Sequence, residues 1–324
     1  MISHTPIRAE SILQLIGNTP VVKLNKIVPA AFNAEIYMKL EYFNPMSSIK
    51  DRLALALISD AEDKGLLKEG GTVIEATSGN TGIGLALICA ERGYKLIITM
   101  PESMSIQRRK ILKTMGAEVI LTPAEKGMKG AVEKAGELHK KIPGSLLGGQ
   151  FTNPVNPLFH EKTTGAEIWT QMEGGIDIFI AAAGTGGTFT GVSRYLKKKN
   201  NKIKTYTVEP AESPVISGGE SSSHKIQGIG AGFIPDTLDT SLIDRVITVT
   251  GKEAENTAAL LARREGIFAG ISTGANVAAA LKTASDFSHR PPLSVVSGVP
   301  QKAELNKNKI RIITIANDTG ERYL

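Results

Sequence analysis

Cysteine is nearly absent from this sequence, and its absence excludes several kinds of chemistry. Cys89 is the only cysteine among 324 residues, so the chain has no internal disulfide and no CxxC motif for a metal or a redox reaction. Cys89 lies in the apolar stretch 84–91, whose pattern is typical of a helix. We therefore interpret it as a buried packing residue rather than a nucleophile, and we predict no metal site.

Long apolar runs are also lacking. No segment approaches the roughly 18 consecutive apolar residues that a membrane-spanning helix requires. Residues 1–5 do not show the basic and then apolar pattern of a secretory signal. From these two absences we expect a cytoplasmic protein that has no membrane partner.

Aromatic residues are few, at 5% of the chain, although the net charge is +6. The short basic runs at 197–199 and 307–311 contain no interleaved aromatic residues that could stack on bases. We therefore predict no nucleic-acid partner and interpret these residues as solvated. A basic surface still favours an anionic substrate or cofactor by electrostatic steering.

What the sequence does contain is an alternation of short apolar runs and longer helical patterns. This alternation predicts an α/β fold in which twisted, mostly parallel sheets are flanked by helices. The length favours two such sheets, divided near 143–149, with the functional site beyond the carboxyl ends of the strands. Strands are predicted at 35–40, 72–75, 95–100, 118–121, 176–181, 204–209, 245–249 and 310–315, and helices at 49–64, 82–92, 105–115, 129–140, 160–171, 187–199, 252–265 and 274–285.

The most informative residue is Lys50, in the stretch 44–52 (NPMSSIKDR). Pro45 interrupts the preceding chain, and Ser47 or Ser48 can cap the helix that follows. Lys50 then falls at the positive end of the helix dipole, where a cation is disfavoured and its proton is held less tightly. This suits a nucleophilic or Schiff-base lysine, although a solvated lysine at a helix start has the same pattern.

Three turns rich in small residues join predicted strands to predicted helices. The turn at 75–82 (EATSGNTG) offers hydroxyl, amide and backbone donors to an anion such as a carboxylate. The turn at 183–188 (AGTGGT) lets backbone amides approach a phosphate, and the turn at 270–275 places Ser272 where it can cap a helix. Each turn alone also fits an ordinary helix start. A lysine together with a phosphate loop that lacks a Walker sequence indicates pyridoxal phosphate held as an imine.

These motifs resemble those of the cysteine synthase (O-acetylserine sulfhydrylase) family, which is a β-family of fold type II pyridoxal-phosphate enzymes. The matches are loose individually but jointly specific, and they run in order over nearly the whole chain. Besides 44–52 and the three turns, they are 17–20, 100–109, 150–154, 225–235 and 266–275. The resemblance implies a two-domain fold like that of the tryptophan synthase β-subunit and a homodimer. The stretch 104–109 favours the sulfide-using A-type enzyme.

The resemblance also implies domain boundaries. A smaller N-terminal domain would cover 35–145, and a larger C-terminal domain would be formed by 1–34 plus 146–324. Within the smaller domain, about 87–138 would swing to close the cleft over a bound carboxylate and exclude water.

Each motif residue receives a role from the resemblance. Lys50, the expected catalytic residue, would bind pyridoxal 5'-phosphate and later remove the α-proton of the substrate. Asn80 would hydrogen-bond the ring hydroxyl of the cofactor, and Ser272 would face its pyridine nitrogen. The phosphate would be held by Gly184, Thr185, Gly186, Gly187 and Thr188, and the substrate by Thr77, Ser78, Gly79, Thr81, Gln150 and Gly228.

A serine facing the pyridine nitrogen has a chemical consequence. Its hydroxyl cannot protonate the ring as a carboxylate would, so loss of a β-leaving group is favoured over transamination. The reaction that the resemblance implies is a transfer in which sulfide replaces the acetate of O-acetyl-L-serine to give L-cysteine. The absence of arginines near the loops favours the acetyl ester over a phosphate ester. No catalytic cysteine is needed, because sulfide is the nucleophile.

Three alternatives share parts of this pattern. Cystathionine β-synthases, which use a thiol nucleophile, carry bulkier polar residues in place of Ala231 and Gly232. Threonine and serine dehydratases have histidine where Thr81 stands. An inactive homologue could instead serve as a binding or regulatory partner, since family members bind the C-terminal peptide of serine acetyltransferase.

The chain departs from the family pattern near its end. The family's usual proline before the last motif is replaced, which leaves Asn317 followed by Asp318 and Thr319. The resemblance places Asp318 and Thr319 near the ring edge of the cofactor, so contacts to the ring nitrogen could be shared or altered. The sequence stops at Leu324, where relatives continue, and the polar stretch 286–308 is a longer surface excursion than we expect. We expect the chemistry to survive these differences.

Overall fold

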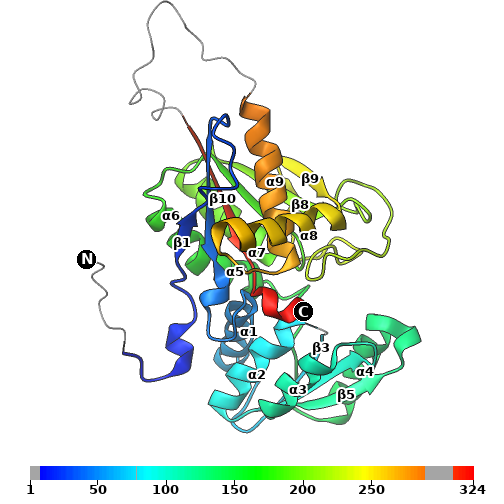
Figure 1. Cartoon of the computed structure of the whole chain (residues 1–324). Coiled ribbons are helices and arrows are strands. Elements are labelled where there is room, and N and C mark those ends of the chain that lie inside the picture. Colours follow the sequence, from blue (N-terminus) through cyan, green and yellow to red (C-terminus); the bar gives the residue numbers. More distant parts are fainter. Residues whose placement is uncertain (1–7, 78, 289–308) are drawn as a thin grey trace, which may run out of the picture. The chain divides into compact units, whose positions relative to one another are not determined.

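The alternation of strands and helices produces two separate sheets (Figure 1). The computed structural model describes residues 8–77, 79–288 and 309–324. They form two compact units. Unit 1 contains residues 8–19 and the described part of Phe43–Gln150, and unit 2 contains Pro20–Tyr42 and the described part of Phe151–Leu324. The predicted fold class, with mostly parallel sheets flanked by helices, is confirmed.

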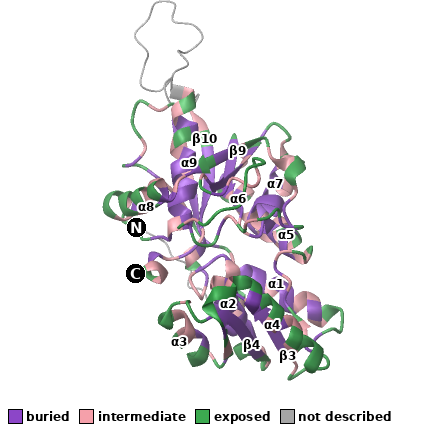
Figure 2. Cartoon of the chain, turned by 90° about the vertical axis from the view of Figure 1, so that its right-hand side faces the viewer, coloured by how far each residue is buried: buried purple, intermediate pink, exposed green. Residues whose placement is uncertain are grey.

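Unit 1 is built on four parallel strands in the order β5-β4-β3-β6. The two central strands are mostly buried, as Figure 2 shows. Val73 of β3 belongs to a cluster with α1, α2 and α3, whereas its neighbour Ile74 packs with α4 on the opposite face. The strands are β3 (Thr72–Ala76), β4 (Lys95–Pro101), β5 (Glu118–Thr122) and β6 (Leu146–Leu147), and the helices are α1 (Lys50–Asp63), α2 (Asn80–Arg92), α3 (Ile106–Thr114) and α4 (Gly127–Lys141).

Unit 2 is built on six strands in the order β1-β2-β10-β7-β8-β9, in which only the β1–β2 pair is antiparallel. The strands are β1 (Val21–Lys23), β2 (Ala34–Leu40), β7 (Ile178–Ala182), β8 (Lys204–Pro210), β9 (Arg245–Val249) and β10 (Ile310–Ala316). The helices are α5 (Val155–His160), α6 (Ala166–Gln171), α7 (Gly187–Lys199), α8 (Gly251–Leu260) and α9 (Ile271–Ser288).

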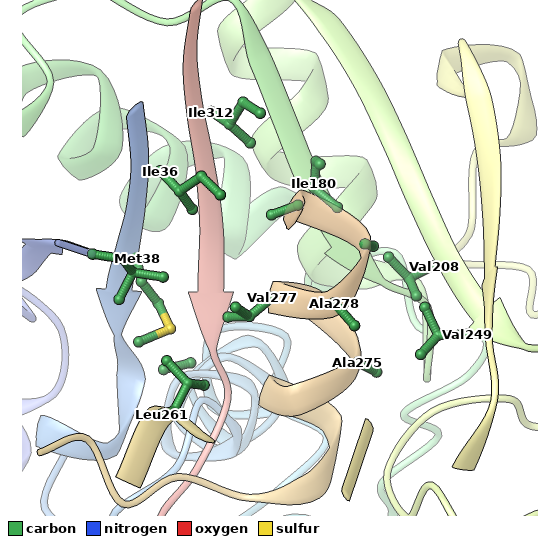
Figure 3. Close-up of a cluster of buried hydrophobic side chains, with 14 of the residues drawn as sticks. Ile36, Met38, Ile180, Val208, Val249, Leu261, Ala275, Val277, Ala278 and Ile312 are labelled. Atoms are coloured by element: carbon green, nitrogen blue, oxygen red, sulfur yellow. The ribbon is translucent and has the colours of Figure 1, made fainter. Parts of the chain in front are cut away.

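The core of unit 2 holds α7 and α9 against the two faces of its sheet. On one face of the sheet, apolar side chains of β2, β7, β8 and β10 pack against Ala275, Val277 and Ala278 of α9 (Figure 3). On the other face, Phe179 of β7 stacks on Phe189 of α7, with ring centroids 6.3 Å apart. Burial of each large apolar side chain contributes roughly 1.5–3 kcal/mol. Phe189 is the third residue of α7, so this contact anchors the start of the helix that follows the predicted phosphate turn.

The predicted elements are present, with a few differences in extent. All eight predicted strands occur within two residues of their predicted bounds, but the short strands β1 and β6 were not predicted. The helix predicted at 160–171 begins at Val155 and contains the π-helical stretch Glu161–Gly165. Residues 286–288 of the predicted surface excursion belong to α9, and 289–308 lie outside the described residues. Within the described chain, no helix is both long enough and apolar enough to cross a bilayer.

The two compact units differ from the predicted domains at their N-terminal boundary. Leu13 and Ile16 pack against the core of unit 1, so residues 8–19 cluster with it. Strand β2 pairs with β10 from Ala34 to Leu40, which places it in unit 2. The functional domains 35–145 and 1–34 plus 146–324, and the moving part at about 87–138, stay predictions.

Candidate functional site

Lys50 is the first residue of α1, so its predicted place in the first helical turn is confirmed. The chain before it turns sharply, with Ser47 in the left-handed region (φ 54°) and its N–H donating to the carbonyl of Asn44 at 2.8 Å. The N–H of Lys50 donates to Ser48 Oγ at 3.2 Å. The N-cap position is Ile49, so neither serine predicted as a cap occupies it, but Ser48 accepts a bond from the first helical N–H.

The backbone around Lys50 is held from several sides. Asp51 Oδ2 accepts the N–H of Met46 at 2.6 Å, which closes the turn in front of the helix. A Cβ added at Gly84 would lie 2.8 Å from the carbonyl oxygen of Lys50, so α2 passes very close to the start of α1. The position of Lys50 thus depends on the packing of these two helices.

The predicted carboxylate loop leads into α2. The N–H of Gly79 donates to Thr77 Oγ1 at 3.2 Å, and the N–H of Thr77 donates to the carbonyl of Thr99 on β4 at the same distance. Asn80 is the first residue of α2, and Thr81 follows it almost fully buried. Ser78 lies outside the described residues. The loop therefore sits at a helix N-terminus, where backbone N–H groups favour an anion.

Gln150 meets this loop although it lies 69 residues from Thr81 in the sequence. Thr81 Oγ1 donates to Gln150 Oε1 at 2.8 Å, and Gln150 Nε2 donates to Glu75 Oε1 at 3.1 Å. All three side chains are buried. Burial raises the pKa of Glu75 to about 7, while the hydrogen bonds from Gln150 and from the N–H of Gly149 act in the opposite direction. The structure thus brings two predicted substrate residues together around an unpredicted carboxyl group.

In unit 2, the predicted phosphate loop forms the start of α7. Gly186 precedes the helix in the left-handed region (φ 85°), a conformation that glycine adopts without strain. A Cβ at Gly184 would overlap the carbonyl oxygen of Gly228, which places these two predicted residues side by side. Thr185 Oγ1 accepts from Asn156 Nδ2 at 3.1 Å, and the carbonyl of Thr185 accepts from the hydroxyl of Thr237.

Thr188 is positioned by a buried histidine. Its Oγ1 lies 3.3 Å from His160 Nε2, and His160 Nδ1 lies 2.9 Å from Thr164 Oγ1. The first N–H groups of α7 have no acceptor within the helix itself. A phosphate binds well where backbone N–H groups at a helix N-terminus are accessible and hydroxyl groups lie nearby. The glycines leave these N–H groups uncovered, and Thr185 and Thr188 supply two hydroxyl groups. The residues present therefore fit the phosphate group of pyridoxal phosphate.

Ser272 lies in the first turn of α9, one residue after the helix begins at Ile271. Its side chain is buried, and its Oγ accepts from Asn317 Nδ2 at 3.0 Å. The backbone N–H of Asn317 donates to Thr273 Oγ1 at 3.1 Å. The residue that departs from the family pattern is thus a direct neighbour of Ser272.

Comparison with known proteins agrees with these features. Residues 12–298 match the family described as "Pyridoxal-phosphate dependent enzyme". The chain belongs to this family. It is 49% identical to a cysteine synthase of Staphylococcus aureus over 97% of this chain and 95% of that protein.

Solved structures show the same relationship. A cysteine synthase (OASS) from Entamoeba histolytica is 40% identical, with a TM-score of 0.90 over 100% of this chain and 92% of that one. An O-acetylserine dependent cystathionine β-synthase from Helicobacter pylori is 36% identical, with a TM-score of 0.86 over 98% of each chain. Pyridoxal phosphate is therefore the cofactor of this family member.

Several supporting residues were not identified from the sequence. Glu75, Asn156, His160 and Thr237 each contact a predicted site residue through a side chain distant in sequence. Only Glu75 could have been noticed in the sequence, because it is a carboxylate at the end of an otherwise apolar predicted strand. The others look like ordinary polar residues until the fold brings them to the loops.

Proposed function

We propose that this chain is a cysteine synthase that converts O-acetyl-L-serine and sulfide into L-cysteine and acetate. The observation that carries the proposal is Lys50 at the first position of α1, packed against the helix that follows the carboxylate loop. Similarity to cysteine synthases over nearly the full chain supports the choice of substrates.

Four groups of residues would hold the cofactor. Lys50 would bind it through Nζ, Asn80 would contact the ring hydroxyl, and Ser272 would face the ring nitrogen. The loop from Gly184 to Thr188 would hold the phosphate at the start of α7. When bound, pyridoxal phosphate supplies an electron-withdrawing ring that stabilises negative charge at the substrate Cα.

The remaining residues bind the substrate and move its protons. Thr77, Ser78, Gly79, Thr81 and Gln150 would bind the carboxylate, with Gly228 also contacting the substrate. As a free amine, Lys50 Nζ would take the proton from Cα while acetate leaves Cβ. Sulfide would then form the new bond at Cβ, and Lys50 would return a proton to Cα before cysteine departs.

Assembly, closure and location belong to the same proposal. We infer a cytoplasmic homodimer, on the resemblance to the family, and a C-terminal peptide of serine acetyltransferase as a ligand of the substrate site. The part at about 87–138 within the domain 35–145 would close over the bound carboxylate. Light scattering tests the dimer, since the chain mass of 34.5 kDa would be doubled.

A second candidate is a replacement reaction in which a thiol takes the place of sulfide. Similarity to the O-acetylserine dependent cystathionine β-synthase favours it. The small residues Ala231 and Gly232, which line a pocket beside Gly184, favour sulfide. Competition between sulfide and homocysteine for O-acetylserine decides between them: mainly cystathionine as product would support the second candidate.

The absorption spectrum of the purified protein tests the proposal as a whole. A visible band of the bound cofactor should shift when O-acetylserine is added and return when sulfide is added, with cysteine released. The Lys50→Ala variant should lack this band. Its kcat should be lower by a factor of about 10²–10⁴. Lys64→Ala, at the other end of α1 in an exposed ion pair with Asp60, should change neither.

An absorption band that does not shift with O-acetylserine or with sulfide would overturn the proposed substrates. It would leave a binding or regulatory role of an inactive homologue as the explanation. A protein that remains colourless after incubation with pyridoxal phosphate would contradict the proposed cofactor site itself.

A further inference from the structure

Unit 1 contains a buried carboxyl group that the proposed reaction does not use. Glu75 is the fourth residue of β3, it is 5% exposed, and its strand leads directly into the carboxylate loop. Burial of a carboxyl group is costly unless hydrogen bonds compensate it. Its neighbours on the strand, Val73 and Ile74, are apolar core residues. A glutamate at this position therefore requires an explanation.

The surroundings of Glu75 are shaped to hold it. A Cβ added at Gly148 would overlap Glu75 Oε2, so the carboxyl group occupies the space that a side chain at position 148 would fill. The N–H of Gly149 bonds to the carboxyl group from the same segment. The carboxyl group of Glu75 thus lies against Gly148 and Gly149, the two residues that follow β6 and precede Gln150.

Glu75 determines which way the amide of Gln150 points. Above its pKa of about 7, Glu75 is ionised and its carboxylate only accepts hydrogen bonds, so it selects the nitrogen of the amide, and Nε2 lies 3.1 Å from Glu75 Oε1. The amide oxygen then faces Thr81, whose hydroxyl donates to it at 2.8 Å. A reversed amide would set its oxygen against the carboxylate and its nitrogen against the hydroxyl hydrogen. With Glu75 ionised, one of the two amide orientations is therefore disfavoured.

We propose that Glu75 is a positioning residue that orients the amide of Gln150, and through it Thr81, for binding the substrate carboxylate. The inference rests on the proposed function, because it gives a purpose to two residues of the proposed carboxylate site. Glu75 acts through Gln150 and does not touch the substrate. Its loss should weaken carboxylate binding without impairing the proton transfer at Lys50.

Glu75→Gln is the direct test, since glutamine keeps the size but can pair with either orientation of the Gln150 amide. At pH 8, where Glu75 is ionised, we expect the KM for O-acetylserine to rise by up to about 10-fold, the effect of losing one hydrogen bond to a charged group. The kcat and the KM for sulfide, which has no carboxylate, should stay near those of the unchanged protein. Thr283→Val is the control, because it removes a buried hydrogen bond near the end of α9 far from Ser272, from Thr283 Oγ1 to the carbonyl of Ala279. It should leave both KM values unchanged.

A double-mutant cycle distinguishes positioning from general loosening of the sheet. If Glu75 acts through Gln150, Glu75→Gln combined with Gln150→Ala should raise the KM for O-acetylserine no further than Gln150→Ala alone. Additive effects would overturn the inference, and so would an unchanged KM in Glu75→Gln. A wild-type protein that makes no cysteine would overturn the proposed function instead. In that case, calorimetric binding of L-alanine, which has the carboxylate but no leaving group, tests the same coupling between Glu75 and Gln150.

Discussion

At the scale of single residues, the buried carboxyl group of Glu75 should make stability depend on pH. Burial raises its pKa from 4.5 to about 7, so the folded state favours the neutral form. Its contribution to stability is complete below the unfolded value of 4.5 and is lost as the pH rises through about 7. Relative to Glu75→Gln, the free energy of unfolding should fall by up to about 3 kcal/mol across this window.

Urea unfolding of both proteins at pH 5 and pH 8 measures this difference. The substitution removes the titrating group, so any pH dependence that remains in Glu75→Gln belongs to other residues. Parallel curves for the two proteins would show that the carboxyl group keeps its ordinary pKa in the folded chain.

Also at this scale, the packing of Gly184 against Gly228 predicts a specific sensitivity in the phosphate loop. Gly184→Ala places a methyl group on the carbonyl oxygen of Gly228, a backbone atom that cannot turn away. Overpacking of this kind costs about 1–3 kcal/mol, so the affinity for pyridoxal phosphate should fall about 10-fold. Titration of the cofactor-free protein, followed by the absorbance of the bound cofactor, measures it.

The matched substitution is Gly136→Ala in α4, where an added Cβ meets nothing within 4 Å. Alanine should stabilise this helix by about 1 kcal/mol and leave the cofactor affinity unchanged. Equal affinity in both variants would mean that the loop before α7 does not carry the phosphate.

At the scale of elements, the sequence was most informative where a pattern is long. The predicted helix 187–199 has the bounds of α7, because its period and its glycine-rich start agree. Strands β1 and β6, of three and two residues, are too short to show a period. The Thr81–Gln150 contact could not be worked out from local pattern, since it depends on β6 pairing beside β3. The family resemblance proposed both residues, but the role of Glu75 became visible only in three dimensions.

Packing between two elements, α1 and α2, carries Lys50 and yields a prediction of its own. Gly84→Ala would bring a methyl group within 2.8 Å of the Lys50 carbonyl, so the two helices must separate. We expect a loss of stability of about 1–3 kcal/mol, together with a lower kcat because the amine is displaced. Thermal unfolding and kinetics of the cofactor-loaded protein measure the two effects. Lower stability with an unchanged kcat would show that Lys50 does not depend on this contact.

At the scale of the whole molecule, the part at 87–138 that we propose to move exposes several apolar side chains. Ile106 is 66% exposed and Val132 is 58% exposed, and Leu121 and Met128 are also exposed. This part includes β4, whose Thr99 carbonyl accepts the N–H of Thr77 in the carboxylate loop. A ligand bound at the loop is therefore connected by a hydrogen bond to a strand within the part that we propose to move.

Binding of a carboxylate at the loop should therefore slow hydrogen exchange at 87–138. L-alanine is a suitable probe, since it has the carboxylate but no leaving group at Cβ, so any closure would be observed at equilibrium. Closure should reduce local opening throughout α3, β5 and α4, because exposed apolar groups would lose contact with water. Strands β8 and β9 of unit 2 serve as the internal reference, and Gln150→Ala should abolish the effect by weakening the ligand contact. Protection confined to the loop itself, with α3 and α4 unchanged, would show that ligand binding and the proposed closure are not coupled.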